Sequence, residues 1–377
     1  MTARPLLLAW VIVLVALGAV AGGVALFGDP RAGAPVLGFD LGSGKAVPAR
    51  KPPQKQANIN LIQAGPQPTE AMPQPPANGQ TPPDATQGAA PPPTQLPPSL
   101  VPQQVIKAVY AGRALIADPA LIEQSSDGPL PRIADDGRTP MAAYAPPSAA
   151  VAGQPRIAIV VSGLGMSARQ TQAAIAQLPP GITLAFVPYD TDVQRWIGEA
   201  RRQGHEVLLE VPMEPYDFPD SDPGPHTLRA AASESTNNQR LSWSLSRATG
   251  YAGIANLLGD RFMTDSDALE PVMTYLARRG LLFFDNGSVS HSAAPDVAKS
   301  VSAPFVQAST EIDAIQAGME IDQRLSGLEQ RARLNGWAVG SATLYPVTVD
   351  RVTIWAKGLA GRGIALVPAS AIVGPSK

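Results

Sequence analysis

Arg-Ile-Ala-Ile-Val-Val-Ser-Gly-Leu-Gly, residues 156–165, is the stretch that decides the fold. Ile157–Val161 is a continuous apolar run rich in β-branched residues, which is typical of a parallel strand covered on both faces. The run ends at Ser162-Gly163, and a helix is expected to start at Ser167. Folds of parallel strands commonly place their chemistry just past the carboxyl ends of the strands. Ser162 and Gly163 therefore hold a position that matters for function.

The chain after this stretch alternates between strand-like and helix-like segments. Such alternation indicates a parallel sheet with right-handed crossovers. The strand candidates are Ile157–Val161, Thr183–Val187, Glu206–Val211, Ala252–Leu257, Leu281–Asp285, Pro304–Ala308, Trp337–Ala342 and Ile364–Pro368. The helix candidates include Thr191–Gln203, Ser266–Arg279, Ile312–Asn335 and Val349–Ala360. We predict an α/β fold, a distorted (β/α) barrel of seven or eight parallel strands.

The amino-terminal third has a different character. Leu6–Phe27 contains no charged residue, and a helix over it would span roughly 33 Å, enough for a bilayer core. We expect a transmembrane anchor there, with a cleaved signal peptide as the alternative. Val47–Pro102 contains 16 of the 40 prolines of the chain and predicts a disordered tether. The expected parts are an anchor (1–28), a Pro/Gln/Ala-rich linker (29–110), an extended arm packing on the domain (111–155) and the barrel (156–372).

Composition excludes several classes of function. The formal net charge of −2 gives no basic excess, so nucleic-acid binding is not expected. There is no cysteine, which removes disulfides and thiolate metal sites. The three histidines are His205, His226 and His291, and none is spaced as a zinc-binding helix requires. His205 lies at the amino-terminal face of the barrel, where a structural role is expected.

Polar residues fall at the carboxyl ends of the predicted strands, which form the functional face of such a barrel. The candidate catalytic residues are Asp285, Glu214 and Glu210, and the candidate cleft-lining residues are Ser162, Tyr189, Asn256, Asn286 and Thr343. The simpler interpretation is that strand ends are polar because they reach solvent. For Glu214 an ion pair with Arg261 is favoured. Ser162 has no evident base, so a serine nucleophile is poorly supported.

Several segments, taken in order, resemble the divergent polysaccharide deacetylase family over about residues 156–370. They are Ile157–Gly165, Gly181–Phe186 with Pro188-Tyr189, Gly204–Leu209 continuing to Pro212-Met213-Glu214-Pro215, Gly259–Phe262, Arg279–Asp285 and Gly363–Pro368. The resemblance implies a barrel like that of NodB-type carbohydrate esterases. It also implies that members with an intact site use an Asp pair and His residues to hold a divalent metal such as zinc. The metal-bound water would attack an acetyl group.

This sequence departs from the family pattern at the implied metal ligands. The Asp pair falls on Ser162 and Gly163, one histidine falls on Glu210, and a second falls on Leu257, which follows Asn256. Serine, glycine and leucine do not supply the charged oxygen or imidazole ligands that a divalent ion requires. Two acidic residues of the family pattern are present, Asp285 and Glu214. We therefore expect no metal and no other cofactor.

Three functions follow from these observations. The first is a membrane-anchored, deacetylase-like protein of envelope carbohydrate metabolism that binds a polysaccharide or an envelope protein without catalysis. The second is an active carbohydrate esterase with a rearranged site, and the third is a structural envelope protein. In each case the expected partners are envelope polysaccharide or protein and the inner membrane through residues 6–27, with the carboxyl-terminal domain in the periplasm.

Overall fold

The computed structural model describes residues 117–148 and 150–373 of the 377-residue chain. The predicted anchor (1–28), the whole predicted linker (29–110) and the first six residues of the predicted arm (111–116) lie outside the described residues. Within the described part of the chain, no helix combines the length and the apolar character needed to cross a bilayer.

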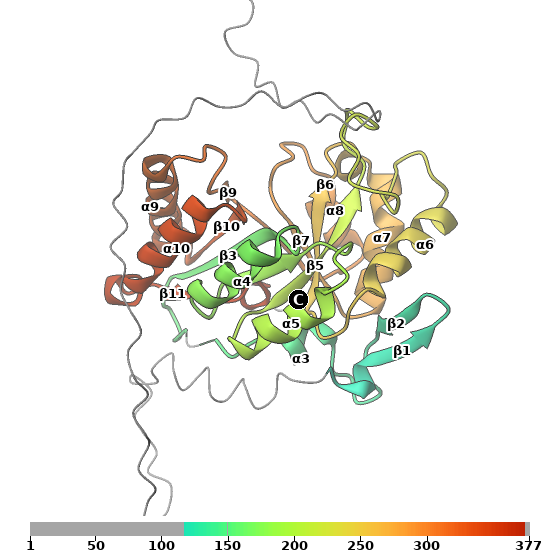
Figure 1. Ribbon diagram of the computed structural model, residues 1–377, viewed down its shortest axis with the longest axis horizontal. Coiled ribbons are helices and arrows are strands. Elements are labelled where there is room, and N and C mark those ends of the chain that lie inside the picture. The colour runs from blue at the N-terminus through green and yellow to red at the C-terminus, as the bar shows by residue number, and fades with distance from the viewer. Residues whose placement is uncertain (1–116, 149, 374–377) are drawn as a thin grey trace, which may run out of the picture. The chain divides into compact units, whose positions relative to one another are not determined.

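A single sheet of parallel strands forms the centre of the domain (Figure 1). Its strands are β3 (Arg156–Leu164), β4 (Thr183–Phe186), β5 (Val207–Met213), β6 (Gly253–Leu258), β7 (Leu282–Asp285), β8 (Phe305–Gln307), β9 (Thr310–Glu311), β10 (Trp337–Thr343) and β11 (Ala365–Leu366). Eight of them follow the spatial order β8-β7-β6-β5-β4-β3-β10-β9, and β11 pairs with β3. All eight predicted strands are present, which confirms the predicted strand–helix alternation.

Helices cover the outside of this sheet (Figure 1). They are α4 (Ala168–Gln177), α5 (Val193–Arg202), α6 (Glu234–Leu245), α7 (Ser266–Arg278), α8 (Ala294–Ser300), α9 (Gly318–Asn335) and α10 (Pro346–Lys357). Ser167 caps α4 as expected, by accepting a hydrogen bond from the backbone N–H of Gln170. The helix predicted over Ser266–Arg279 is α7; Ser266 was expected to cap it, but the cap is Asp265, because the Asp265 carboxylate accepts from the N–H of Ala268.

The two ends of the sheet are joined by a single short run of chain. The strands β8 and β9 are separated only by Ala308 and Ser309. The N–H of Ala308 donates to the carbonyl of Asp285 in β7 (2.9 Å), and that of Ser309 donates to Val339 in β10 (2.8 Å). The sheet therefore curls until its two edges meet at this run, which gives the predicted distorted barrel. The sequence did not predict β9, because a two-residue strand has no periodicity to read.

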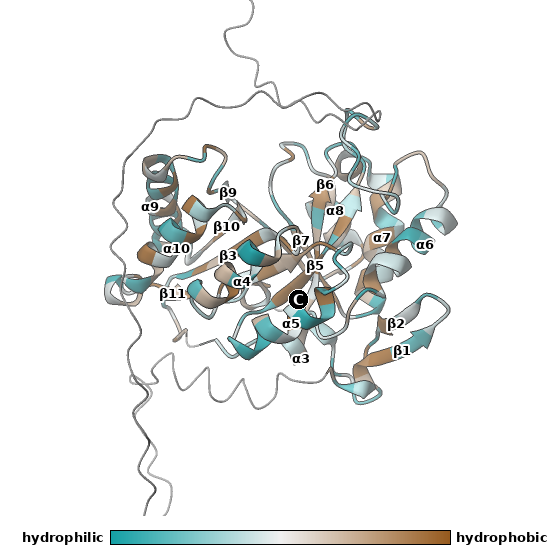
Figure 2. Ribbon diagram, in the orientation of Figure 1, coloured by the Kyte–Doolittle hydropathy of each residue, from teal (hydrophilic) through white to brown (hydrophobic). Residues whose placement is uncertain are grey.

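Successive side chains of a strand point to opposite faces of the sheet, and the apolar ones therefore form two separate clusters. The outer cluster lies under the helices and includes Ile157, Ile159 and Phe283. The inner cluster fills the barrel and includes Val160, Leu208 and Phe284. In Figure 2 the central strands are largely coloured as hydrophobic, whereas α5 carries much hydrophilic colour. Most strands are buried on both faces, which explains their continuous apolar runs.

Residues 117–148 lie beside the barrel and include a hairpin of β1 (Ile122–Ser125) and β2 (Gly128–Pro131), followed by α3 (Pro140–Tyr144). Arg279, just after α7, donates to Glu123 (2.6 Å) and to the carbonyl of Pro131 (2.7 Å). Tyr144 of α3 is buried in the inner cluster. These contacts fix residues 117–148 against the amino-terminal ends of the strands, which we call the floor of the barrel.

Candidate functional site

A bulge at the end of β3 shapes the opposite end of the barrel, which we call the mouth. The register between β3 and β4 shifts between Val161 and Leu164. Gly163, inside this shift, has a φ of 85°, a left-handed conformation that favours glycine. Its N–H donates to Oε1 of Glu210 at 2.8 Å. β-Bulges commonly re-aim groups beside active sites, and this one ties the end of β3 to a carboxyl group of β5.

Glu210 lies inside the barrel, on the same side of β5 as Leu208 of the inner cluster. Its side chain is 1% exposed. Its second oxygen, Oε2, is buried and has no hydrogen-bond partner among the described residues. Burial raises the pKa of Glu210 from 4.5 to about 7, against the opposing effects of the Gly163 N–H and the Ser162 hydroxyl. The structure thus brings together three predicted positions, Ser162, Gly163 and Glu210, around one carboxyl group.

Asp285 is fully buried at the end of β7. Phe284 belongs to the inner cluster, so alternation puts Asp285 on the outer side of the sheet. Its Oδ1 accepts from the N–H of Gly287, and its Oδ2 accepts from Nε2 of Gln307, both at 2.9 Å. These bonds hold the β7–α8 connection to β8. A catalytic role for Asp285 stays a prediction, and both of its oxygens already have structural partners.

Glu214 fixes the loop that follows β5. Its Oε2 accepts from the N–H of Ala230 at 2.7 Å. Its Oε1 lies 3.9 Å from Nε of Arg261, which confirms the favoured ion pair at a long distance. The backbone carbonyl of Glu214 also accepts from the N–H groups of Arg261 and Phe262. Glu214 therefore joins the loops after β5 and β6.

The predicted cleft-lining residues Asn256 and Asn286 are joined to each other. Oδ1 of Asn256 accepts from the N–H of Asn286, and Nδ2 of Asn256 donates to the carbonyl of Leu258, each at 2.9 Å. Leu258 has a φ of 55°, which is unusual for a residue other than glycine. The buried amide of Asn256 thus fixes the backbone turn at the end of β6.

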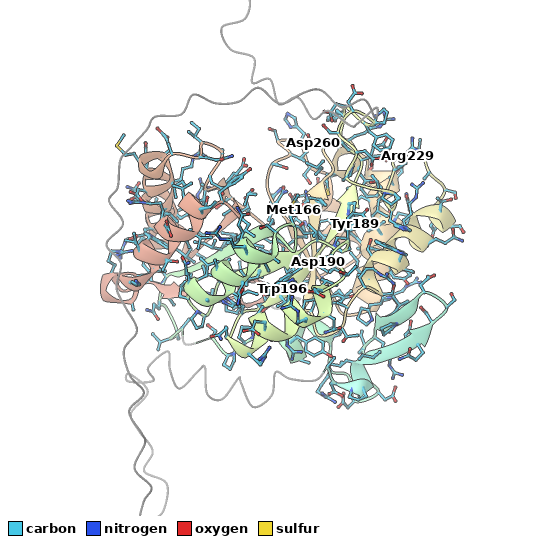
Figure 3. The ribbon with its side chains drawn as sticks, in the orientation of Figure 1. Met166, Tyr189, Asp190, Trp196, Arg229 and Asp260 are labelled. Atoms are coloured by element: carbon cyan, nitrogen blue, oxygen red, sulfur yellow. The ribbon has the colours of Figure 1, made fainter. Side chains whose placement is uncertain are left out.

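Tyr189 lies in an aromatic cluster outside the barrel interior. Its ring is 5.4 Å from that of Trp243, on which His226 stacks at 3.6 Å. Burial and the nearby guanidinium groups of Arg247 and Arg240 lower the pKa of His226. Figure 3 labels Tyr189 on the loop after β4, together with Met166 after β3 and Asp260 after β6. Tyr189 and His226 therefore belong to the loops around the mouth.

Sequence reasoning missed Asp313, a second buried carboxyl at the carboxyl ends of the strands. Its Oδ2 accepts from the N–H of Thr343 and from the hydroxyl of Thr348, both at 2.8 Å. Its Oδ1 is buried without a partner within the described chain, and burial raises its pKa. Thr343, a predicted cleft residue, pairs with Ser162 between β10 and β3. The signal was hidden because Asp313 was assigned to the start of a long helix, whereas α9 begins at Gly318.

The donor set does not fit a divalent metal of the kind that the resemblance implies. Glu210, Glu214 and Asp285 have oxygens engaged by groups of the chain itself. His205 is buried, with ring nitrogens 2.9 Å and 3.3 Å from the carbonyls of Ile182 and Ile175. Across residues 117–148 and 150–373, no three His, Cys, Asp or Glu side chains are grouped so that they could hold a metal ion.

A cavity of about 800 Å³ lies away from the mouth, between the hairpin and helices α6 and α7. Its lining includes Glu123, Asn238, Glu270, Tyr275 and Arg278. None of the predicted site residues lines it. We place the candidate site at the mouth because the bulge, the unpartnered carboxyl oxygen and the left-handed leucine all lie there.

Comparisons with known proteins identify a family and several similar proteins. A family model described as divergent polysaccharide deacetylase matches residues 159–373. A crystal structure of an uncharacterized protein from Agrobacterium tumefaciens C58 is similar at 42% identity with a TM-score of 0.64, and the match covers 65% of this chain and all of that one. The catalytic domain of a peptidoglycan N-acetylglucosamine deacetylase from Eubacterium rectale matches at 14% identity with a TM-score of 0.38, over 60% of this chain and 92% of that one.

Two curated relatives also match. An uncharacterized protein of Haemophilus influenzae is 27% identical over 146 residues, which are 39% of this chain and 51% of that protein. The uncharacterized protein YibQ of Escherichia coli is 24% identical over 144 residues, 38% of this chain and 44% of that protein. The chain thus spans about half the length of the curated relatives it matches.

Proposed function

Because the chain belongs to the divergent polysaccharide deacetylase family, we propose that it binds an acetylated envelope polysaccharide at the mouth of its barrel and does not carry out metal-dependent deacetylation. One observation carries the proposal. Ser162, Gly163 and Glu210, at positions where the resemblance implies metal ligands, are instead associated with one another through the Gly163–Glu210 hydrogen bond. A backbone N–H is a hydrogen-bond donor and cannot bind a cation, and a carboxyl group with a raised pKa is less readily ionised. The two groups are therefore better suited to hydrogen bonding than to metal coordination.

The surroundings of the mouth support a sugar ligand. Its loops expose Tyr189 and Tyr216 among polar side chains such as Asp260 and Arg261. Aromatic rings pack on the apolar face of a sugar ring, while polar groups bond its hydroxyls. This mixture favours a neutral carbohydrate over a purely apolar ligand.

The proposal extends to location. We infer a single-pass inner-membrane protein with the barrel in the periplasm, supported by the uncharged segment Leu6–Phe27 and the proline-rich segment Val47–Pro102. Protease added to intact spheroplasts should digest the barrel of the membrane-bound protein. Protection of the barrel until the membrane is lysed would contradict this orientation.

A direct test combines binding and turnover on one sample. The full-length protein, in a mild detergent, is mixed with a hexamer of N-acetylglucosamine, with and without added zinc. We expect saturable binding, no release of acetate, and no zinc retained after dialysis. Zinc-dependent acetate release would contradict the proposal, and so would the absence of any binding.

A second candidate function rests on the pKa of Glu210. A carboxyl group with a pKa of about 7 is suited to general acid–base catalysis near neutral pH. In that case the protein is an esterase with a rearranged site, and Glu210→Gln abolishes acetate release from an acetylated sugar. Equal rates for the Glu210→Gln variant and the natural protein would remove this candidate.

A further inference from the structure

The rim between the ends of β5 and β6 presents two apolar side chains to solvent. Tyr216, in the loop after β5, is 66% exposed, and Leu258, the last residue of β6, is 43% exposed. Met213 pairs with Leu258 in the β5–β6 register, and Tyr216 follows Met213 by three residues. The Glu214 carbonyl accepts from Arg261 and Phe262, which binds the two loops together. Tyr216 and Leu258 therefore belong to the same part of the rim.

Tyr216 is held in place although its ring is exposed. Its hydroxyl lies 2.9 Å from Oγ1 of Thr264. Because the Thr264 hydroxyl donates to the carbonyl of Arg261, Tyr216 is the donor in this contact. The ring is thus fixed at its hydroxyl end, and its rotational freedom is reduced before any ligand arrives.

Leu258 is exposed at a cost in backbone energy. Its φ of 55° is left-handed, and Leu in this conformation is unfavourable because Cβ crowds the backbone. The turn persists because Nδ2 of the buried Asn256 bonds the Leu258 carbonyl, and Oδ1 of Asn256 bonds Asn286 in the next connection. Strain of this kind is commonly kept where a side chain must be presented for function.

Polar groups flank the two apolar side chains. Asp260 and Arg261 directly follow Gly259, and the Arg261 side chain is half-exposed. Figure 3 shows Asp260 on this part of the rim. A carboxylate and a guanidinium beside an aromatic ring can accept from and donate to sugar hydroxyls. The combination fits a pyranose ring better than the extended apolar surface of a protein partner.

We propose that Tyr216 and Leu258 form the platform on which a pyranose ring of the bound polysaccharide packs, with Asp260 and Arg261 bonding its hydroxyl groups. This inference rests on the proposed function and adds the residues that make the contact. The ligand class is a neutral oligosaccharide of pyranose rings, for which an oligomer of N-acetylglucosamine serves as the probe.

The test is titration of the full-length protein with the N-acetylglucosamine hexamer, followed by calorimetry or by chemical-shift changes. Tyr216→Ala should weaken binding about tenfold, which is the effect of losing one aromatic stacking contact. Tyr216→Phe keeps the ring and should weaken binding by no more than about threefold. The matched control is Trp337→Ala, which removes an aromatic side chain of 43% exposure at the opposite, amino-terminal end of β10 and should leave the affinity unchanged.

Leu258→Asn separates this role from a structural one. Asn tolerates the left-handed conformation, so the variant should melt a few degrees higher while binding the hexamer severalfold more weakly. A merely structural leucine would not show this opposite pair of changes. If the natural protein binds the hexamer and Tyr216→Ala and Leu258→Asn bind it equally well, the platform is wrong while the proposed function stands. If the natural protein does not bind the hexamer, both are overturned.

Discussion

Two glutamates lie inside the barrel. Glu206, just before β5, is at the floor, and Glu210, within β5, is at the mouth. At the floor, Oε2 of Glu206 accepts from the hydroxyl of Thr183 (3.0 Å) and from the N–H of Ser370 (3.2 Å). At the mouth, Oε1 of Glu210 accepts from the Gly163 N–H, and Oε2 has no partner in the described part of the chain. Burial raises the pKa of both groups. Oε1 of Glu206 likewise has no partner among the described residues, so the two groups differ in what their bonded oxygen joins. At the floor it joins two distant segments of the chain, Thr183 and Ser370, whereas at the mouth it accepts from the Gly163 N–H.

The difference separates parts of the molecule that complete the fold from parts that are free to bind. At the floor, carboxyl-terminal residues bond the barrel, as when the N–H of Ala369 donates to Thr183. At the mouth, the strained Leu258 and the exposed Tyr216 remain uncovered by the described residues. The largest loss of stability is therefore expected from mutations at the floor, whereas effects on binding are expected only from mutations at the mouth.

The largest expected effect is at the floor. Glu206→Ala should lower the free energy of unfolding by about 2–4 kcal/mol, because it opens a cavity and leaves the Ser370 N–H and the Thr183 hydroxyl without their acceptor. Urea denaturation at pH 7 measures this loss. Glu206→Gln keeps an acceptor and the side-chain volume, so it serves as the control. A smaller loss for Glu206→Ala than for Glu210→Ala would break the distinction between floor and mouth.

The second prediction concerns pH at the mouth. The unfolded chain releases the Glu210 proton near pH 4.5, and the folded chain releases it near pH 7. The protonated group therefore contributes fully to stability below about pH 4.5. This contribution declines as the pH rises and is lost above about pH 7. Glu210→Gln does not titrate, so it should be more stable than the natural protein by about 3 kcal/mol at pH 8. At pH 4.5 the two should unfold alike. Parallel stability curves of the two proteins across this range would contradict the buried, neutral carboxyl.

The bulge provides the third prediction. Gly163→Ala should cost about 1–2 kcal/mol of stability, because alanine is unfavourable at a φ of 85°. The added methyl group itself has room, since its nearest neighbours, atoms of Leu344, Met166 and Thr343, are 3.8–3.9 Å away. Thermal unfolding measures the loss. Gly361→Ala is the matched control, because Gly361 is not in the left-handed region and an added carbon there meets no atom beyond its chain neighbours within 4 Å. Equal losses for the two variants would contradict an effect of backbone strain at Gly163.

The smallest expected effect is at the ion pair of Arg261, which we compare with the ion pair of Arg279. Arg261→Ala at the mouth should change stability by no more than about 0.5 kcal/mol, because the Arg261 side chain is half-exposed and 3.9 Å from Glu214. Arg279→Ala near the floor should cost about 1–2 kcal/mol, because Arg279 is largely buried and bonds both Glu123 and Pro131. Chemical denaturation compares the two variants. Equal losses would show that the floor is no better bonded than the mouth.

Much of the fold could be predicted from the sequence because it depends on local patterns. The apolar runs indicated the eight predicted strands, and the glycines after the predicted helices, Gly204, Gly280, Gly336 and Gly361, indicated approximately where those helices end. The errors concern how two helices begin. Asp265 caps α7 instead of Ser266, and α9 starts at Gly318 rather than at Ile312, because Ile312 continues the barrel after β9 through its N–H bond to the Ser341 carbonyl.

The candidate site was predictable only in part. Strand ends identified Ser162 and Glu210 as neighbours of the mouth, and Glu214 was correctly paired with Arg261. Asp285 looked most promising by its position, yet its oxygens bond Gly287 and Gln307, and Asp313 was not found at all. The register of a strand decides which face of the sheet the side chain of a terminal residue lies on. A shift of one residue moves that side chain to the opposite face.

The amino-acid sequence by itself determined the order of strands and helices, the absence of cysteine, and the loss of the implied metal ligands, because each is a property of residue type or local spacing. Only the tertiary structure decided that the sheet closes through residues 308–309, that Gly163 bonds Glu210 across β4, and that Oε2 of Glu206 accepts from two groups whereas Oε1 of Glu210 accepts from the Gly163 N–H. The physical reason is that barrel closure brings together groups far apart in the sequence, and their burial, not their identity, sets their pKa and their free bonding capacity.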